Sequence, residues 1–364
     1  MIRTAHYVSL DDVGVLSPVQ TMEIDAPPVR GMIVEMSGCT ICGSDLHSYR
    51  GRRHAPPGTI LGHEMVGRVV EIDSAWGVDG DSGTMNDKIP SDRITVGDRV
   101  IWSLVASCGS CELCAVGLPQ KCKSAFKYGH GPMDTSLGPC GGLSDTCMIV
   151  PGTVVLKVPE SLPLEVVCPA SCATATATAI LETAGNIAGK TVGLFGGGLL
   201  GLSCLAIAKT RGVGSFIVVD PSEHRRRFAE SFHADQVLGV FDFEQDKGRT
   251  HDLDIAIDCS GSVAAIRGAL QRLRTGGRLI LAGSVFPCDS IDVNPETIVR
   301  QHWTIAGVHN YAPRQLRQAL QFLGKHHKGF PFSDVVSQWF PLDQTAEAFA
   351  AAEDPRRLRV GVRP

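Results

Sequence analysis

The sequence has no excess of positive charge, and this absence limits the kinds of partner that it can attract. Its 364 residues include 34 lysines and arginines against 38 aspartates and glutamates, which gives a net charge of −4. Such a balance provides no broad electrostatic attraction for nucleic acid or for an anionic membrane surface. We therefore expect a small-molecule substrate, with neither nucleic acid nor a membrane as a partner.

The sequence also lacks a long apolar run and a leader-like beginning. Its most apolar stretch, residues 191–208, is too short and too often interrupted by glycine to predict a membrane span. The first residues, MIRTAHYVSLDDVG, contain no basic region followed by an apolar segment, and the 13 cysteines are an odd number. Neither feature is typical of a secreted protein held by disulfides, so we expect reduced thiols and a cytoplasmic location.

The length of the chain and a change in its residue pattern near residue 163 predict two domains. Up to residue 163, glycines, prolines and short β-branched runs such as 65–72 and 99–102 predict a mostly β domain. Residues 164–308 alternate between strand and helix patterns, which predicts an α/β domain with a parallel sheet. Its candidate elements are residues 191–195, 199–210, 216–220, 224–232, 254–257, 263–273 and 278–282. The remaining residues, 309–364, are expected to pack on the first domain.

Four cysteines in the segment 107–123 have a spacing suited to a metal ion. They are Cys108, Cys111, Cys114 and Cys122, in the pattern C-x2-C-x2-C-x7-C. Four thiolates fill the coordination shell of zinc and leave no position for water, so the pattern predicts a structural zinc site. The alternatives are four unlinked buried thiols and a zinc ribbon that binds nucleic acid. The second is disfavoured because the segment has only Lys121 and Lys123 as cations and no interleaved aromatic residues.

A second group of candidate ligands is dispersed along the chain. Cys42, His63 and Cys172 would form a Cys2His set that leaves one position open for an alcohol oxygen. Zinc in such a site makes a bound alcohol acidic enough to lose its proton near neutral pH. Taken singly, each of these residues is more typical of a buried structural role. Cys39 and Cys168 compete for the same roles, and spacing alone does not exclude them.

Two carboxylates accompany these candidate ligands. Asp45 can hold a ligand histidine through the second ring nitrogen, as metal sites require. Glu64, next to His63 in the sequence, is a candidate for transient contact with the metal. Their presence strengthens the prediction of a catalytic metal site.

A glycine-rich turn follows the strand candidate 191–195 and leads into an apolar helix. In GGGLLG, Gly196 would form the tight turn, Gly198 would allow the pyrophosphate of a dinucleotide to approach, and Gly201 would permit close packing of helix on strand. Leu199 and Leu200 would begin the helix, whose N-terminus favours a phosphate. The segment therefore predicts a dinucleotide-binding site.

Asp220, at the end of the next strand candidate, bears on the choice of dinucleotide. Its carboxylate would accept hydrogen bonds from the adenosine ribose hydroxyls and repel a 2′-phosphate, which favours NAD over NADP. The arginines at 225–227 oppose this preference. We expect them on the solvated start of a helix, although Arg225 is also a candidate for contact with the cofactor.

Several motifs together resemble a known family over essentially the whole chain. They are GSDLH after Cys42, ILGHEMVGRVVEI from Ile60, GDRV from Gly97, the four-cysteine segment, GGLSDTCMIVPGTVVLKVPE from Gly141, and FGGGLLG. The sequence is similar to the zinc-containing medium-chain alcohol dehydrogenases. The resemblance implies a GroES-like catalytic domain (1–163), a Rossmann NAD-binding domain (164–308) and a C-terminal return (309–364). It also implies one catalytic and one structural zinc per chain, an alcohol or carbonyl substrate, and a homodimer or homotetramer.

The resemblance also assigns individual residues. It selects Cys42, His63 and Cys172 as the ligands of the catalytic zinc. Thr176, four residues after the third ligand, is expected to border the nicotinamide. Ser44 is expected to bind the alcohol oxygen and to begin a proton relay that runs through the cofactor ribose to His47, because a hydroxyl and an imidazole can pass a proton to water. Arg359 is expected to contact the cofactor phosphates.

One part of the sequence points to a particular substrate class. The segments SYRGRRH, GLPQKCKSAFKYGH and CATATATA resemble a subgroup of these dehydrogenases associated with phosphonate metabolism. A guanidinium group can donate two parallel hydrogen bonds to two oxygens of a phosphonate. Arg52 and Arg53 are therefore candidate substrate contacts. The alternative is that this arginine-rich run is a solvated surface. Our hypothesis is a hydroxyalkyl-phosphonate or a similar anionic alcohol as the substrate.

Two other function classes compete with a zinc-dependent alcohol dehydrogenase. A non-catalytic protein that binds NAD or zinc could keep the same fold, since fold alone does not establish function. A related reductase could act on an activated double bond without zinc. The first would not need the complete set of ligands and relay residues, and the second predicts that the ligands are lost. The sequence keeps the full set of candidate ligands and relay residues, which argues against both alternatives.

Overall fold

The computed structural model describes residues 2–77, 93–245 and 253–364. The polar, Gly- and Asp-rich segment 75–93, which we expect to form a surface loop, lies mostly outside the described residues. The chain divides into two compact units. Unit 1 comprises Met1–Cys172, Ala312–Lys325 and Phe332–Pro364, and unit 2 comprises Ala173–Tyr311 and His326–Pro331.

Unit 1 is built mainly from short strands around one mixed sheet. The strands are β1 (Arg3–Tyr7), β2 (Leu10–Asp12), β3 (Val15–Leu16), β4 (Gln20–Ile24), β5 (Met32–Ile41), β6 (Glu64–Ile72), β7 (Arg99–Trp102), β8 (Val105–Ala106), β9 (Phe126–Lys127), β10 (Thr146–Ile149), β11 (Val155–Lys157), β18 (Val336–Pro341) and β19 (Arg359–Arg363). The α-helices are α1 (Gly43–Tyr49), α2 (Glu112–Ala115), α3 (Leu164–Val167), α10 (Pro313–His326) and α11 (Thr345–Ala352). Short 3-10 turns include Pro119–Lys121, Cys168–Ser171, Phe332–Asp334 and Leu342–Gln344.

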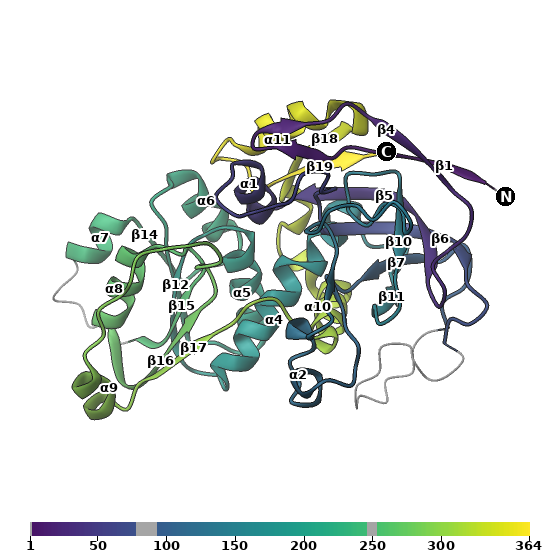
Figure 1. Cartoon of the computed structure of the whole chain (residues 1–364). Helices are drawn as coiled ribbons and strands as arrows, with labels where there is room; N and C mark the ends of the chain where they lie inside the picture. Colours follow the sequence, from purple (N-terminus) through teal and green to yellow (C-terminus); the bar gives the residue numbers. More distant parts are fainter. Residues whose placement is uncertain (1, 78–92, 246–252) are drawn as a thin grey trace. The chain divides into compact units, whose positions relative to one another are not determined.

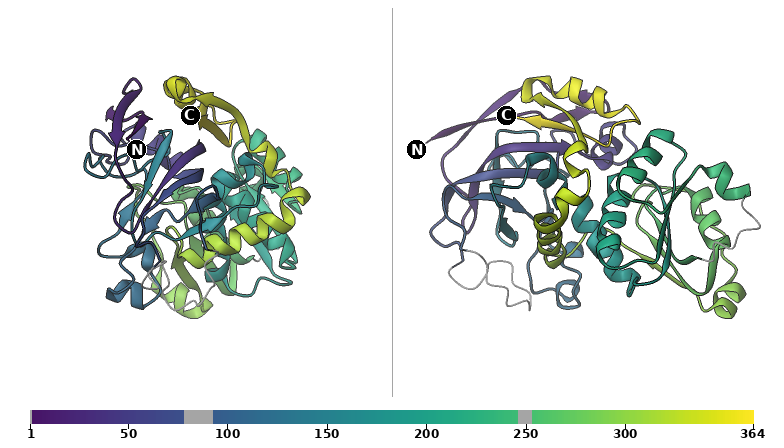
Figure 2. Two further views of the ribbon diagram at one scale, coloured as in Figure 1. Left: turned by 90° about the vertical axis from the view of Figure 1, so that its right-hand side faces the viewer. Right: turned by 180° about the vertical axis from the view of Figure 1, so that it is seen from behind.

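The main sheet of unit 1 pairs the C-terminal strand of the chain with a strand from its first part. Its strand order is β11-β7-β6-β5-β19-β18, and β10 also pairs with β5. The C-terminal strand β19 pairs antiparallel with β5, with Val360 opposite Ile41 and Val362 opposite Cys39 (Figure 2). Because β5 is buried along most of its length, its backbone N–H and C=O groups need a strand partner on each edge. The last residues of the chain supply one of them.

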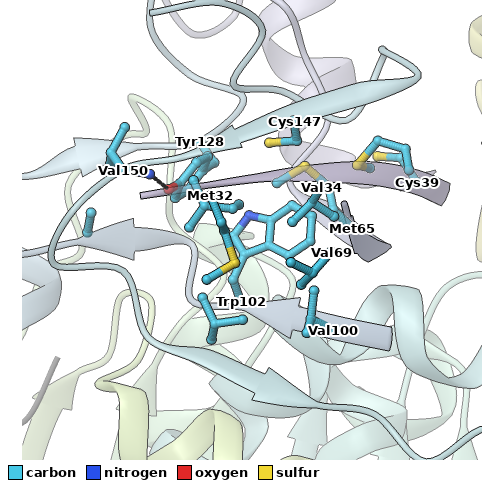
Figure 3. Packing of buried hydrophobic residues seen from close by; sticks show 14 residues of the cluster. Met32, Val34, Cys39, Met65, Val69, Val100, Trp102, Tyr128, Cys147 and Val150 are labelled. Atoms are coloured by element: carbon cyan, nitrogen blue, oxygen red, sulfur yellow. Dashed lines mark hydrogen bonds between the residues drawn. The ribbon is translucent and has the colours of Figure 1, made fainter. Parts of the chain in front are cut away.

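An aromatic pair anchors the core of unit 1 (Figure 3). The rings of Trp102 and Tyr128 are both buried and meet edge to face, with their centroids 6.3 Å apart. The Tyr128 hydroxyl accepts a hydrogen bond from the Val150 amide at 2.9 Å and bonds to the Thr153 hydroxyl at 2.7 Å. A buried tyrosine needs such partners for its polar end. These contacts fix the segment around Tyr128, which follows the four-cysteine segment.

Unit 2 contains a six-stranded parallel sheet with helices on both faces. The strand order is β14-β13-β12-β15-β16-β17. In chain order this is 3-2-1-4-5-6, the doubly wound Rossmann topology. In Figure 1, α4 and α5 lie on one side of this sheet and α8 on the other. The elements are α4 (Ala173–Ala184), β12 (Thr191–Phe195), α5 (Leu199–Thr210), β13 (Ser215–Val219), α6 (Glu223–Ser231), β14 (Gln236–Leu238), α7 (Val240–Gln245), β15 (Leu253–Asp258), α8 (Val263–Gln271), β16 (Leu273–Leu281), α9 (Pro295–Gln301), β17 (Thr304–Gly307) and the 3-10 turn His327–Gly329.

The predicted α/β fold class is confirmed, because unit 2 contains a Rossmann sheet and unit 1 consists mainly of β-strands. Most predicted bounds differ from the observed ones by at most one residue, and the largest error concerns one helix and the strand after it. The helix expected to reach residue 273 ends at Gln271, and β16 already begins at Leu273 rather than at residue 278. Gly276 and Gly277 interrupt the strand pattern in the sequence, and Gly276 has a positive φ of 76°. The strand nevertheless continues past this irregularity, where its register against β15 shifts.

Among the described residues, no single helix has both the length and the apolar composition to cross a membrane. One bent pair, Leu164–Ser171 with Ala173–Ala184, meets these two criteria only when its helices are taken together.

Candidate functional site

The structure brings four potential metal ligands together in unit 1. They are Cys42, His63, Glu64 and Cys172, and one ligand atom from each lies within 4.8 Å of all the others. The two sulfurs are 3.9 Å apart. A tetrahedral zinc with Zn–S bonds of about 2.3 Å holds its sulfurs about 3.8 Å apart. The donor set therefore fits zinc, with two thiolates, one imidazole and a carboxylate nearby.

Local structure explains how Cys42 and His63 reach this position. Cys42 follows β5 directly and is the N-cap of α1, where the Asp45 carboxylate accepts a hydrogen bond from the Cys42 amide at 2.9 Å. His63 immediately precedes β6, which pairs antiparallel with β5. Since Thr40 lies opposite Glu64 in this pairing, the end of β5 and the start of β6 bring the two ligands together.

Asp45 holds the ring of His63, the candidate histidine ligand. Its Oδ1 lies 3.0 Å from His63 Nδ1, and both side chains are buried. This leaves Nε2 as the nitrogen available to a metal. The Gly62 amide also donates to Asp45 Oδ1 at 3.2 Å, so the carboxylate has several partners in the buried site. The imidazole is therefore held in a single tautomer and orientation.

The charge distribution favours a thiolate at Cys42. A hydrogen bond with Cys172 holds the pKa of the Cys42 thiol well below its usual value, although burial opposes this effect. The positive charge of Arg359 and the nearby His63 act in the same direction as Cys172. Because the thiolate is the form that binds metal, this environment prepares Cys42 as a ligand.

The alternative cysteines lie elsewhere. Cys39 is part of the buried apolar cluster around Trp102, and its sulfur is near the Thr40 carbonyl at 3.6 Å. Cys168 is also buried and directs its sulfur to the Gly38 carbonyl at 3.4 Å. Neither belongs to a metal-binding group within the part of the chain that the structure describes. Burial raises the pKa of both thiols well above the usual value, which disfavours the thiolate.

A buried ion pair lies beside this metal site. Arg359 donates to Glu64 through Nε at 2.7 Å and through Nη2 at 2.8 Å. The Thr40 hydroxyl also donates to Glu64, at 2.6 Å, and Arg359 Nη2 is 3.6 Å from Cys42 Sγ. The sequence did not predict this pair, because its members are 295 positions apart. The expected contact of Arg359 with cofactor phosphates stays a prediction.

The proposed relay residues both lie on α1. Ser44 Oγ is 3.3 Å from His63 Nε2, so its hydroxyl is next to the nitrogen available to the metal. Burial lowers the pKa of His47, and the positive charge of Arg52 lowers it further. A neutral imidazole is thereby favoured, and this is the form that accepts a proton. Their roles in a relay remain predictions.

The four-cysteine segment also has the geometry of a metal site. Ligand atoms of Cys108, Cys111, Cys114 and Cys122 lie within 4.8 Å of one another. The sulfur of Cys122 is 3.4 Å from that of Cys108 and 3.9 Å from that of Cys111. Both distances are close to the sulfur separation in a tetrahedral zinc site. Four thiolates and no further donor fit a structural zinc.

We expect Cys108→Ala to remove one of two zinc ions per chain, as measured by elemental analysis. Binding of a structural zinc contributes directly to local folding, so proteolysis within 107–123 should become at least about tenfold faster. Cys140→Ala is the matched control, because Cys140 belongs to neither metal-binding group. Retention of both zinc ions by the Cys108 variant would refute the assignment.

The glycine-rich turn of unit 2 has the expected backbone features. Gly196 has a φ of 106°, and a Cβ there would lie 2.9 Å from the Ser260 amide nitrogen. A Cβ at Gly201 would lie 2.3 Å from the Gly196 carbonyl oxygen, so helix α5 packs closely on the turn. Gly198 is the N-cap of α5 and faces open space. Leu199 and Leu200 begin α5, whose amides are oriented to bind a phosphate.

Asp220 lies at the end of β13 and is buried. Its carboxylate accepts hydrogen bonds from the Gly197 amide at 2.7 Å and from the Ser222 amide at 2.8 Å. Arg225 Nη1 is 4.0 Å from the same carboxylate, on the first turn of α6. Thr176 lies in α4 and is partly exposed. The acidic residue therefore adjoins the glycine-rich turn, where a ribose hydroxyl would need a partner.

The sequence reasoning missed two residues near the catalytic metal site. The His130 ring lies against that of His63, with their centroids 4.9 Å apart. Lys127 is near enough to Cys172 and Asp45 for their charges to affect its pKa. Both occur in the tract KCKSAFKYGH, and the part of that tract in the family resemblance was the available signal.

Comparisons with known proteins agree with these features. Residues 30–160 match the model of the alcohol dehydrogenase GroES-like domain, and residues 200–325 match that of the zinc-binding dehydrogenase. The L-threonine 3-dehydrogenase of Pyrococcus furiosus is 32% identical over 301 residues, which cover 79% of each chain. An alcohol dehydrogenase from Thermotoga maritima superimposes with a TM-score of 0.88, at 27% identity and full coverage of both chains. A zinc-binding dehydrogenase from Sinorhizobium meliloti, solved with NADP, has a TM-score of 0.83 at 22% identity and full coverage of both chains.

Proposed function

Because the chain belongs to the zinc-dependent medium-chain alcohol dehydrogenase family, we propose that it interconverts an alcohol and an aldehyde or ketone by hydride transfer with NAD. The observation that carries this proposal is the convergence of Cys42, His63 and Cys172 with one carboxylate beside them. A double-bond reductase that works without zinc would not need these ligands, and neither would a protein that only binds a dinucleotide.

The side chains around the metal position have distinct tasks in this reaction. Zinc bound there lowers the pKa of an alcohol and polarises a carbonyl group. Asp45 holds His63 so that Nε2 faces the metal position. Ser44, 3.3 Å from that nitrogen, is placed to accept the alcohol proton. His47, one turn further along α1, is our candidate for passing the proton to water.

We propose NAD rather than NADP as the cofactor, on the basis of Asp220. A 2′-phosphate next to this buried carboxylate would bring like charges together, which costs several kcal/mol. Arg225 is close enough to offset part of that repulsion. Because its guanidinium already faces Asp220, we expect the carboxylate to dominate.

For the wild-type enzyme we expect kcat/KM to be at least about 100-fold higher with NADH than with NADPH. Asp220→Ser removes the carboxylate and should lower the ratio of kcat/KM with NADH to kcat/KM with NADPH at least about tenfold. Asp242→Ser is the control, since Asp242 is an exposed residue of the same unit. Comparable kcat/KM values for NADH and NADPH in the wild type would contradict the preference for NAD.

For the substrate we propose an anionic alcohol, with a phosphonate as the candidate that the sequence favours. Arg53 is partly buried and donates to the Ser48 hydroxyl of α1 at 2.8 Å, whereas Arg52 is exposed. Both arginines also act on His47, whose pKa they lower. Positive charge is therefore concentrated near the relay residues, where an anionic substituent of the alcohol would be stabilised.

The position of β17 supports a proposed homodimer or homotetramer. Among the described strands it pairs with β16 alone, at the edge of the six-stranded sheet. An edge strand of this kind can pair with a second copy across a two-fold axis. The mass of the particle in solution, measured by light scattering, distinguishes these states from a monomer.

The proposed activity is tested by measuring zinc per chain together with NADH formation on neutral and anionic alcohols. Two zinc ions and turnover of any alcohol in the panel would support an alcohol dehydrogenase. One zinc and no turnover would indicate a structural site beside an inactive centre, and would favour a binding protein instead.

A further inference from the structure

Lys127 is close enough to the candidate metal ligand Cys172 to be affected by its charge, but it belongs to neither metal-binding group. It is on β9, opposite Val105 of β8, and its side chain is partly buried. Burial lowers the pKa of Lys127 to about 8, and the positive charge of Arg53 contributes to this shift. The negative charges of Cys172 and Asp45 act in the opposite direction. The lysine is thus mostly protonated at neutral pH, and Arg53 and the candidate ligand Cys172 are near enough for their charges to act on it. Arg53 is fixed to α1 through Ser48, and His130, three residues after Lys127, lies against His63.

Neither of these two cations is neutralised by an acidic side chain among the residues that the structure describes. Arg53 donates from Nε and Nη2 to the Ser48 hydroxyl, at 3.1 and 2.8 Å, which orients the guanidinium but supplies no charge. By contrast, Arg359 is paired with Glu64 and Arg50 with Glu353. Two partly buried cations without a paired carboxylate carry a cost that the charges of Cys172 and Asp45 offset only in part, and a bound anion would reduce that cost.

The backbone that carries Lys127 is held firmly. Its neighbour Tyr128 is fully buried, with its hydroxyl bonded to Val150 and Thr153 (Figure 3). The Tyr128 carbonyl is 2.7 Å from Nδ1 of His130, whose ring lies against the ligand His63. These contacts connect β9 to the metal ligand through a short, ordered segment. Lys127 is therefore preorganised relative to the metal position, as a specificity-determining residue needs to be.

We propose that Lys127 and Arg53 form an anion-binding subsite beside the catalytic metal position, and that this subsite selects alcohols carrying an oxyanion substituent. The inference rests on the proposed dehydrogenase function and identifies its substrate class. A carboxylate and a phosphonate share the required chemistry, which is an oxygen-rich negative group that accepts charge-assisted hydrogen bonds. Arg52 is exposed and is not assigned to the subsite.

The test uses three alcohols that share the unit HO–CH2–CH2–X. They are propan-1-ol, 3-hydroxypropanoate and 2-hydroxyethylphosphonate, which differ in whether X is neutral, a carboxylate or a phosphonate. In the zinc-loaded enzyme with NAD, kcat/KM should be higher for at least one anionic alcohol than for propan-1-ol. Lys127→Met and Arg53→Ala should each lower that value about 10- to 100-fold, as expected for a charged hydrogen bond. For Lys127→Met, kcat/KM for propan-1-ol should change less than about threefold. Because Arg53 also acts on His47, the Arg53 variant is judged by its ratio of kcat/KM for the anionic alcohol to kcat/KM for propan-1-ol.

Two further variants separate a local role from general effects. Lys157→Met removes a lysine of the same unit that pairs with Asp98 at 2.9 Å, and it should leave all three kcat/KM values nearly unchanged. Lys127→Arg keeps the charge and should retain most of the preference for the anionic alcohol. Comparison of 3-hydroxypropanoate with 2-hydroxyethylphosphonate then identifies which oxyanion the subsite prefers.

The kinetic results distinguish an absent anion-binding subsite from an absent dehydrogenase activity. Turnover of propan-1-ol without any preference for the anionic alcohols would overturn the subsite and leave the dehydrogenase proposal intact. An equal loss of kcat/KM for neutral and anionic alcohols in Lys127→Met would also overturn it. If no alcohol is turned over, binding of the two anionic alcohols is measured calorimetrically. Equal affinity in wild type and Lys127→Met would then refute the subsite, and weaker binding in the variant would support it.

Discussion

Cys172→Ala is expected to lower kcat/KM for the alcohol substrate by at least about 1000-fold. Lewis-acid catalysis contributes several kcal/mol of transition-state stabilisation, and each 1.4 kcal/mol or so corresponds to a factor of ten in rate. Cys172 supplies one of the two thiolates in the metal-binding group, so its removal should also reduce the zinc content from two ions per chain to one. Steady-state kinetics and elemental analysis of the same preparation measure both effects.

Cys168→Ala is the matched control for this experiment. Cys168 is only four residues away and is buried, but it lies outside both metal-binding groups. The control should keep two zinc ions and lose less than about tenfold in kcat/KM, because only a small side chain changes. If the Cys168 variant lost zinc while the Cys172 variant kept it, the assignment of the third ligand would be wrong.

Arg359→Met is expected to destabilise the protein by about 3–5 kcal/mol. The substitution leaves the Glu64 carboxylate buried without its counter-charge, and breaking one side of a buried ion pair has a cost of this size. The Arg359 and Glu64 side chains are only 9% and 0% exposed. The free energy of unfolding, measured by denaturant titration of the zinc-loaded protein without NAD, should fall by this amount. Omitting NAD separates the effect from any contact with the cofactor.

Two comparisons make the Arg359 experiment decisive. The double variant Glu64→Gln/Arg359→Met should recover much of the lost stability, since no uncompensated charge remains. Arg68→Met removes an arginine whose pair with Glu160 is mostly exposed, at 47% and 67%, and it should cost less than about 1 kcal/mol. A loss of less than about 1 kcal/mol in Arg359→Met would mean that the buried pair is not a determinant of stability.

Local patterns in the sequence were sufficient for much of the fold. The helix expected at 199–210 is α5, with the same bounds, because an apolar segment directly after a glycine-rich turn has few alternatives. The strand expected at 191–195 is likewise β12. The boundary between α8 and β16 was missed, since two glycines within a strand resemble a turn. Local patterns fail where pairing with a neighbouring strand overrides the preference of the segment itself.

The two metal-binding groups differ in how much of them could be predicted. The four cysteines within 107–123 are close in the sequence, so their spacing alone brings the sulfurs together. Cys42, His63 and Cys172 come from distant segments, and spacing could not distinguish them from Cys39 and Cys168. Their assignment came from the resemblance to a family. The pairing of β5 with β6 gives an independent geometric reason for the position of His63.

The types of residue available for chemistry follow from the sequence: a four-cysteine segment, further candidate metal ligands, a glycine-rich turn and an acidic residue at the following strand end. Which donors meet depends on the tertiary structure, and so do the pairing of Glu64 with Arg359 and the electrostatic contact of Lys127 with Arg53 and Cys172. The reason is that coordination and ion pairing depend on distances of a few ångströms. Between segments far apart in the chain, those distances are set by strand pairing and core packing, which no local pattern records.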